Sequence, residues 1–117
     1  MRLEGARPKL HRSNDPPLLI LTSLADGPKH GHALFKDIEE FAGISLGPGA
    51  LYGAITRLED RGLIEPLPDS GRRRPYRITA AGRSALEGAV RQMQSLAQEG
   101  AARLGLAAPP RVAGTWA

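Results

Sequence analysis

The segment of residues 15–28, DPPLLILTSLADGP, constrains the fold more than any other part of the chain. It carries a run of aliphatic side chains: Leu18, Leu19, Ile20, Leu21 and Leu24. On a helix these positions lie nearly all round the axis, so the helix needs other elements to enclose it. Helix is favoured over strand because proline is tolerated in a first helical turn, where Asp15 can cap. Gly27 and Pro28 end the segment.

Two further helices are predicted downstream. Residues 29–43, KHGHALFKDIEEFAG, have helical apolar spacing and a glycine stop; the apolar residues are Leu34, Phe35, Ile38, Phe41 and Ala42. After the short connector ISLG, residues 47–62 read GPGALYGAITRLEDRG. There Gly47 is the expected cap and Pro48 the first helical residue. The predicted inward stripe is Leu51, Ala54, Ile55 and Leu58.

Residues 63–79 predict a β-hairpin tipped with arginines. Residues 63–67 form the first strand, which Pro66 confines to an edge or an end. Residues 74–79 form the second strand, with Tyr76 and Ile78 on one face. Thr79 can then cap a long helix whose apolar and small residues alternate in steps of four and three. This heptad-like seam comprises Leu86, Val90, Met93, Ala97, Gly100 and Leu104.

The expected fold is mainly α with a small β-hairpin: a winged helix-turn-helix domain plus a long C-terminal dimerisation helix. The predicted organisation is a flexible basic arm at 1–15, the winged domain at 16–79, the dimerisation helix at 80–105 and a disordered tail at 106–117. The arm carries Arg2, Arg7, Lys9 and Arg12. For the arm, a disordered segment is favoured over a DNA contact.

Composition narrows the functional classes. The 117 residues carry a formal net charge of +4, which favours a polyanionic partner over merely solubilising charge. The absence of cysteine excludes disulfides and thiolate chemistry. We expect no enzyme, cofactor or metal site, because no nucleophile–base set is present and the pair His30 and His32 faces different directions on a helix. No apolar run could span a bilayer, so we expect a cytoplasmic, nucleoid-associated protein without a membrane partner.

Three stretches resemble the PadR-type transcriptional regulators between residues 18 and 86: LLILTSLADGPKHGHALFKDIEE, PGALYGAITRLEDRGLIE and RRRPYRITAAGRSAL. The resemblance implies a dimeric winged-helix DNA-binding repressor, paired through its C-terminal helix and released from DNA by an effector. The short C-terminus is similar to that of the smaller subclass, with one long helix after the wing. The sequence departs from the family pattern at His32, where tyrosine is usual, at Gly47 and Ala50, where hydroxyls are common, and at Gly53, where proline is common.

The residues expected to contact DNA lie on the second and third helices and on the wing: Lys36, Gly49, Ala50, Tyr52, Gly53, Thr56, Arg57, Arg72, Arg73, Arg74 and Arg77. The expected dimer contacts are Leu86, Val90, Met93, Ala97 and Leu104. The expected partners are double-stranded DNA with a pseudo-palindromic operator, a second copy of the chain and a possible small hydrophobic effector.

Alternatives remain open at several positions. Tyr52 either reaches a phosphate or packs half-inside against the second helix. Arg57 either reaches the DNA or pairs with Glu59 or Asp60. The wing arginines either enter a minor groove or sit on a solvated turn. Trp116 either lines an effector pocket or belongs to the disordered tail. For the whole chain, the alternative function is a winged-helix protein–protein adaptor without specific DNA binding.

Overall fold

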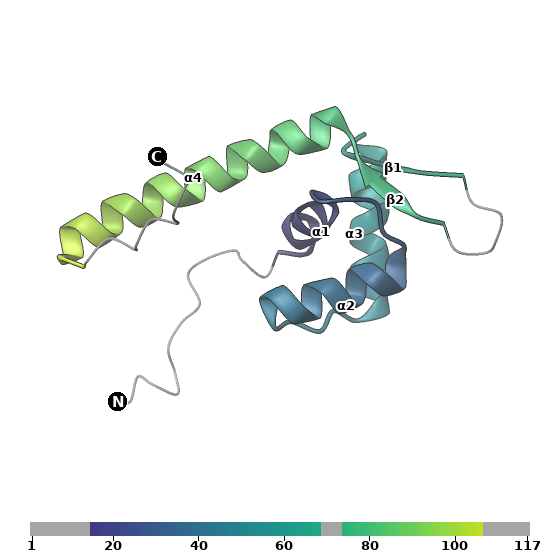
Figure 1. The fold of residues 1–117 in the computed structure, drawn as a ribbon, viewed down its shortest axis with the longest axis horizontal. Coiled ribbons are helices and arrows are strands. Elements are labelled where there is room, and N and C mark those ends of the chain that lie inside the picture. The colour runs from purple at the N-terminus through teal and green to yellow at the C-terminus, as the bar shows by residue number, and fades with distance from the viewer. Residues whose placement is uncertain (1–14, 69–73, 107–117) are drawn as a thin grey trace. The chain divides into compact units, whose positions relative to one another are not determined.

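The computed structural model describes residues 15–68 and 74–106 (Figure 1). Its elements are α1 (Pro16–Leu24), α2 (Gly31–Ala42), α3 (Pro48–Asp60), β1 (Ile64–Pro66), β2 (Tyr76–Ile78) and α4 (Ala80–Leu104). This mainly helical fold with an antiparallel hairpin and a long C-terminal helix is the predicted one. The predictions for the basic arm, for Arg72 and Arg73 and for Trp116 fall outside the described residues.

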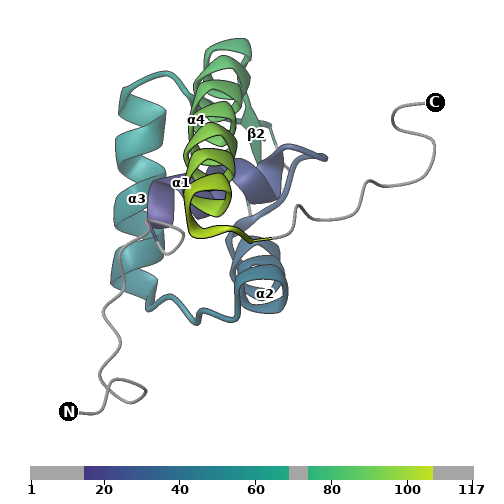
Figure 2. The same ribbon diagram turned by 90° about the vertical axis from the view of Figure 1, so that its left-hand side faces the viewer.

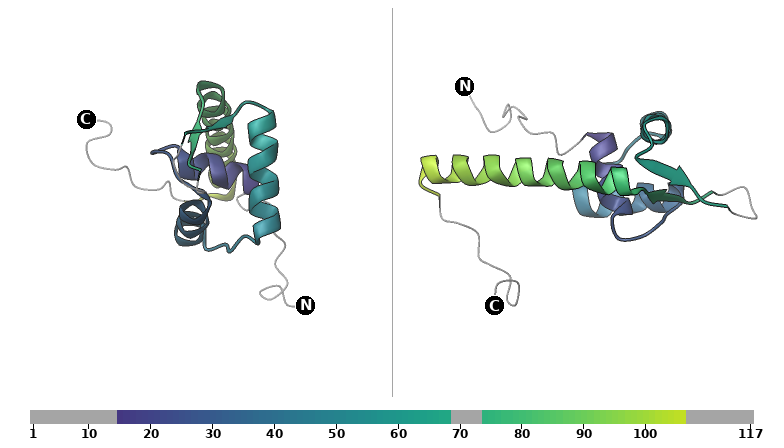
Figure 3. Two further views of the ribbon diagram at one scale, coloured as in Figure 1. Left: turned by 90° about the vertical axis from the view of Figure 1, so that its right-hand side faces the viewer. Right: turned by 90° about the horizontal axis from the view of Figure 1, so that it is seen from above.

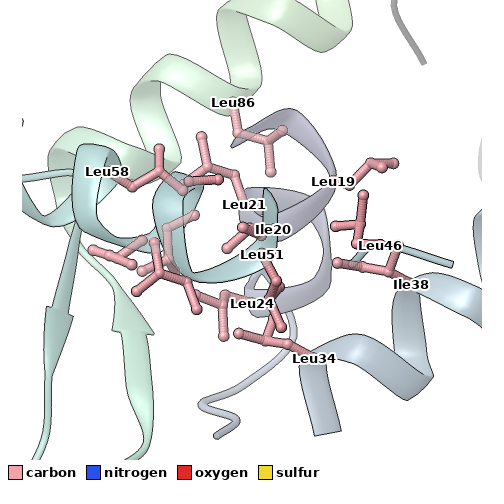
Figure 4. Close-up of a cluster of buried hydrophobic side chains, with 14 residues drawn as sticks. Leu19, Ile20, Leu21, Leu24, Leu34, Ile38, Leu46, Leu51, Leu58 and Leu86 are labelled. Atoms are coloured by element: carbon pink, nitrogen blue, oxygen red, sulfur yellow. The ribbon is translucent and has the colours of Figure 1, made fainter. Parts of the chain in front are cut away.

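Helix α1 lies at the centre of the first compact unit, Met1–Leu86, between α2 and α3 (Figure 2, Figure 3). Its aliphatic residues Leu19, Ile20, Leu21 and Leu24 are all buried, as their distribution round the helix predicted. Side chains from α2, α3, the hairpin and the first turns of α4 complete the core around it (Figure 4). Leu86 of α4 belongs to this same core.

Most helix ends follow the predicted chemistry. Gly47 precedes α3 with Pro48 in its first turn, and Gly43 ends α2 with a left-handed φ of 67°. The Thr79 hydroxyl accepts a hydrogen bond from the Gly82 amide at 3.0 Å, which caps α4. Asp15 is the exception: it occupies the N-cap position of α1, but its side chain makes no capping hydrogen bond. Pro17 lacks the N–H that such a side chain would otherwise accept from the second helical position.

The prediction that Phe41 faces the core is wrong, because its exposed fraction is 47%. Near the end of α2 the connector folds back on the core and fills this region instead. Leu46 is buried there, and Ile44 packs against the same cluster. Of the other predicted apolar residues of α2, Leu34 and Ile38 are fully buried, whereas Phe35 and Ala42 are partly buried against the same core.

The hairpin is shorter than predicted and has an unpredicted neighbour. Its register pairs Ile64 with Ile78 and Pro66 with Tyr76. On the other side of β2, Lys29 and Tyr76 exchange two backbone hydrogen bonds, at 3.1 and 2.9 Å. The chain segment between α1 and α2 is thereby tied to the base of the wing.

A polar network links α1 to α2. Ser23 is only 2% exposed, and its hydroxyl donates to the Asp37 carboxylate at 2.6 Å. The Lys29 ammonium donates to the Ser23 carbonyl and to Asp26, at 2.7 Å in the latter case. This hydrogen bond and the charge of Lys29 lower the pKa of the Asp26 carboxyl. Ser23 is the one buried polar side chain among residues 15–68 and 74–106, and it therefore has a hydrogen-bond partner.

Gly82 permits α4 to start directly against the segment that precedes β1. A Cβ at this position would stand 2.0 Å from the Leu63 carbonyl oxygen and 2.9 Å from a side-chain carbon of Ile78. The same carbonyl oxygen of Leu63 accepts a hydrogen bond from the Thr79 amide, at 3.1 Å. The backbone cannot withdraw without breaking this bond, so the contact requires glycine.

We therefore expect Gly82→Ala to lower the free energy of unfolding by about 1–3 kcal/mol, the usual cost of overpacking. The matched control is Gly88→Ala in the same helix, where a Cβ meets nothing within 4 Å. That change should raise stability by about 0.5–1 kcal/mol through helix propensity. Urea unfolding followed by circular dichroism measures both. Equal effects of the two substitutions would contradict the role of the Leu63 contact.

Candidate nucleic-acid interface

The outward side of α3 is nearly bare at its start. The predicted inward stripe is confirmed, since Leu51, Ala54, Ile55 and Leu58 are all buried. The opposite side holds glycine or alanine at three of the predicted DNA-contact positions: Gly49, Ala50 and Gly53. Such a surface allows the close approach of another backbone.

Tyr52 stands on this side and also packs against α2. Half of its surface is exposed, at 50%. Its hydroxyl lies over Gly31, so that a Cβ on Gly31 would be 2.2 Å from the hydroxyl oxygen. The two interpretations weighed for Tyr52 are thus compatible: the hydroxyl end of the side chain lies against Gly31 of α2, and half of the residue's surface is accessible.

An open cleft of about 480 Å³ lies beside Tyr52, between α2 and the connector that leads into α3. Its walls combine apolar residues with a few polar ones: His32, Phe35, Ser45, Pro48, Leu51 and Tyr52. The cleft is within the size range of small-ligand sites.

Thr56 and Arg57 continue the exposed side of α3. The Thr56 hydroxyl donates to the Tyr52 carbonyl at 3.0 Å, which leaves its oxygen lone pairs free to accept. Arg57 forms no ion pair with Glu59 or Asp60, and its guanidinium extends toward the open position at Gly53. The alternative for Arg57, a surface pairing with Glu59 or Asp60, is therefore not the arrangement found.

Arg74 and Arg77 are the wing arginines that the structure describes, and they lie in different environments. Arg77 pairs with Glu65 across the hairpin, with a distance of 3.0 Å between the Arg77 Nε and a Glu65 carboxylate oxygen. Its charge is thus compensated within the hairpin, unlike the expectation that it adds to the wing-tip charge. Arg74 lies two residues before β2 and is exposed. Lys36, on α2, is also exposed.

Tyr76, at the base of the wing, is partly buried against the core and feels the charge of Glu59 at the end of α3, a placement that sequence reasoning missed. Burial raises the pKa of its phenol, and the negative charge of Glu59 raises it further, whereas Arg74 opposes the shift. These charges act on Tyr76 because the hairpin and the end of α3 lie close together. The signal in the sequence was only the placement of Tyr76 on the same strand face as Ile78.

The predicted dimer residues also divide into two groups. Leu86 is buried in the core of the domain, where it packs with the residues around α1, so it is the least accessible of the predicted dimer contacts. Val90, Met93 and Leu104 are exposed, with exposed fractions of 37%, 42% and 75%. Ala97 is exposed as well. Exposed aliphatic residues at heptad spacing are typical of a surface that meets another helix.

Metal and membrane sites find no support in the described ranges. Among residues 15–68 and 74–106, no group of three or more His, Cys, Asp or Glu side chains could hold a metal ion. None of the helices in those ranges is long and apolar enough to cross a bilayer.

The chain is similar in sequence and in fold to known transcriptional regulators. The family described as Transcriptional regulator PadR-like matches residues 20–88. The chain is 39% identical over 85 residues to the transcriptional regulator Rv3488 of Mycobacterium tuberculosis, covering 70% of this chain and 78% of that protein. It is 49% identical over 85 residues to an uncharacterized 37.1 kDa protein in transposon TN4556 of Streptomyces fradiae. That match covers 73% of this chain but only 25% of the relative.

Among solved structures, a PadR family transcriptional regulator from Eggerthella lenta is 32% identical, with a TM-score of 0.64. The match covers 75% of this chain and 79% of that one. The family consists of transcriptional regulators and not of enzymes. By its sequence match, and with the fold that its structural neighbours share, the chain belongs to the PadR-like family of transcriptional regulators.

Proposed function

We propose that this protein is a sequence-specific DNA-binding repressor that acts as a homodimer and leaves its operator when a small hydrophobic effector binds. The observation that carries the proposal is the outward side of α3, where small residues surround the half-exposed Tyr52 and a basic wing follows directly in the chain. A protein of this kind would work in the cytoplasm, at the nucleoid.

In the proposed complex, α3 enters the major groove. Gly49, Ala50 and Gly53 let the helix approach the duplex, and Tyr52 reaches a phosphate. Thr56 and Arg57 lie further along the same side, where they meet base edges. With so few hydrogen-bonding groups on the first turn, the start of α3 positions the protein more than it reads sequence.

Other elements supply contacts to the DNA backbone and the adjacent groove. Lys36, which is exposed on α2, would meet a phosphate. The wing arginines Arg72, Arg73 and Arg74 suit the negative potential of a minor groove. Arg77 is the weakest member of the proposed set, because Glu65 already compensates its charge.

Dimerisation through α4 would present two recognition helices related by a two-fold axis. The operator would then be pseudo-palindromic, with half-sites about one helical turn apart. Val90, Met93, Ala97 and Leu104 are the proposed contacts. The repressor role and the effector rest on the family resemblance, and the cleft beside Tyr52 has room for a small molecule.

We expect the purified protein to retain specific fragments of its source genome in a gel shift at low and moderate salt. A promoter cloned with such a fragment should drive less reporter expression when the protein is present, because the bound dimer blocks transcription. Increased expression would replace repression by activation. Retention of no specific fragment at any salt would favour the protein–protein adaptor.

The triple variant Arg72→Ala, Arg73→Ala, Arg74→Ala tests the wing. Log affinity should fall linearly with log salt, with a slope of about 0.9 per neutralised phosphate, so the variant should flatten the slope by about 2–3. The control is Arg91→Ala on α4, an exposed arginine outside the proposed interface. A slope unchanged by the triple variant would remove the wing from the interface.

Val90→Glu and Met93→Glu test the dimer. A carboxylate in an apolar helix seam is costly to desolvate, so light scattering should give the mass of one protomer. Ser95→Glu is the control, because Ser95 is exposed on the side of α4 opposite to the seam. If the two seam variants keep the mass of two protomers, the dimer forms elsewhere.

A further inference from the structure

We infer that Gly31 is a positioning residue for Tyr52: its missing side chain sets where the Tyr52 ring stands, and so joins the start of α2 to the start of α3 in one docking edge. The inference rests on the proposed DNA-binding function. It concerns a residue outside the predicted interface, on a different helix from the one expected to enter the groove.

The contact between the two residues leaves no room for a methyl group. A Cβ on Gly31 would lie 2.2 Å from the Tyr52 hydroxyl oxygen, 2.9 Å from the ring carbon that bears it and 3.2 Å from the next ring carbon. Gly31 itself is buried. The hydroxyl end of Tyr52 therefore occupies the space that any other residue at position 31 would fill.

The backbone gives no separate reason for glycine at this position. Gly27, Gly43, Gly62 and Gly105 have positive φ angles, whereas Gly31 does not. Gly31 is the first residue of α2, and alanine is a better helix former than glycine. The steric requirement comes from Tyr52.

The consequence of adding a side chain differs from that at Gly82. At Gly82 the obstacle is the Leu63 carbonyl, which belongs to the backbone and cannot move cheaply. At Gly31 the obstacle is the far end of a side chain that is half exposed and free to rotate outward. A methyl group should therefore displace the Tyr52 ring while leaving the fold intact.

A displaced ring would disturb the docking edge. The neighbouring positions Gly49 and Gly53 carry no side chains, so neither residue would hold the ring in a new orientation. Its hydroxyl would leave the place from which it reaches a phosphate, and its bulk would stand on the side that approaches the duplex. Both effects weaken binding of DNA without altering the residues that read bases.

The test combines Gly31→Ala with Tyr52→Ala in a double-mutant cycle on a selected operator fragment. Gly31→Ala alone should reduce affinity about ten-fold, in the range expected for one lost charge-assisted hydrogen bond, with the melting temperature nearly unchanged. In the Tyr52→Ala background the same change should alter affinity less than about two-fold, because the coupling has been removed. Gly88→Ala, where a Cβ meets open space, is the control for glycine replacement and should leave affinity unchanged.

A second readout does not depend on DNA. The chain has two tyrosines, so ring-labelled protein gives two sets of NMR signals, and Tyr52→Phe identifies one of them. Gly31→Ala should shift the Tyr52 signals and leave those of Tyr76 in place. Unmoved Tyr52 signals, or an equal loss of affinity in both backgrounds, would overturn the inference.

The two hypotheses fail in different ways. If the unaltered protein binds no fragment, the proposed function is wrong, and the DNA role of Gly31 is wrong with it. If the unaltered protein binds and Gly31→Ala binds equally well, only the inference about Gly31 is overturned.

Discussion

The enclosure of α1 is the contact on which the rest of the domain depends. This helix has no charged residue and would not be stable alone in water, so it is buried in a core to which α2, α3 and the hairpin contribute side chains. Ile20 and Leu24 are almost completely removed from solvent. The hydrogen bond from the Ser23 hydroxyl to Asp37 fixes the orientation of α2 against α1, because a hydrogen bond requires a specific geometry. Aliphatic packing alone tolerates several arrangements of the two helices. The orientation of the outward side of α3 is thus set from its buried side.

The features that the sequence predicted well are those encoded by neighbours in the chain. The inward stripe of α3 follows from helical spacing, and Thr79 at the start of α4 follows from capping chemistry. The pairing of Lys29 with Tyr76 was not predictable in the same way, because it joins residues far apart in sequence and involves one residue of an otherwise irregular segment. The prediction that Phe41 faces the core failed for a related reason. Helical periodicity shows which side of a helix is apolar, but it does not show which other segments of the chain pack against that side.

The candidate site also combines features that sequence spacing predicts with features that depend on how distant elements pack. Tyr52 could be placed on the outward side from spacing alone, yet its packing over Gly31 depends on how two helices meet. The pairing of Arg77 with Glu65 depends on strand register, which a short hairpin with an arginine-rich turn leaves open. Counting arginines therefore overstated the free charge of the wing. The contact of Gly31 with Tyr52 lies outside the predicted interface, and only the packed structure identifies it.

The short strand β1 affects whether copies of this protein can aggregate when they lie close together, as they would on DNA in the proposed function. Its far edge has no strand partner within residues 15–68 and 74–106, and such an edge can recruit a strand from another molecule and start aggregation. Here the strand spans only Ile64–Pro66, and its last residue lacks the N–H that a new ladder would require. A strand that added to this edge would lack one ladder hydrogen bond at Pro66, so the edge is a poor template for sheet extension.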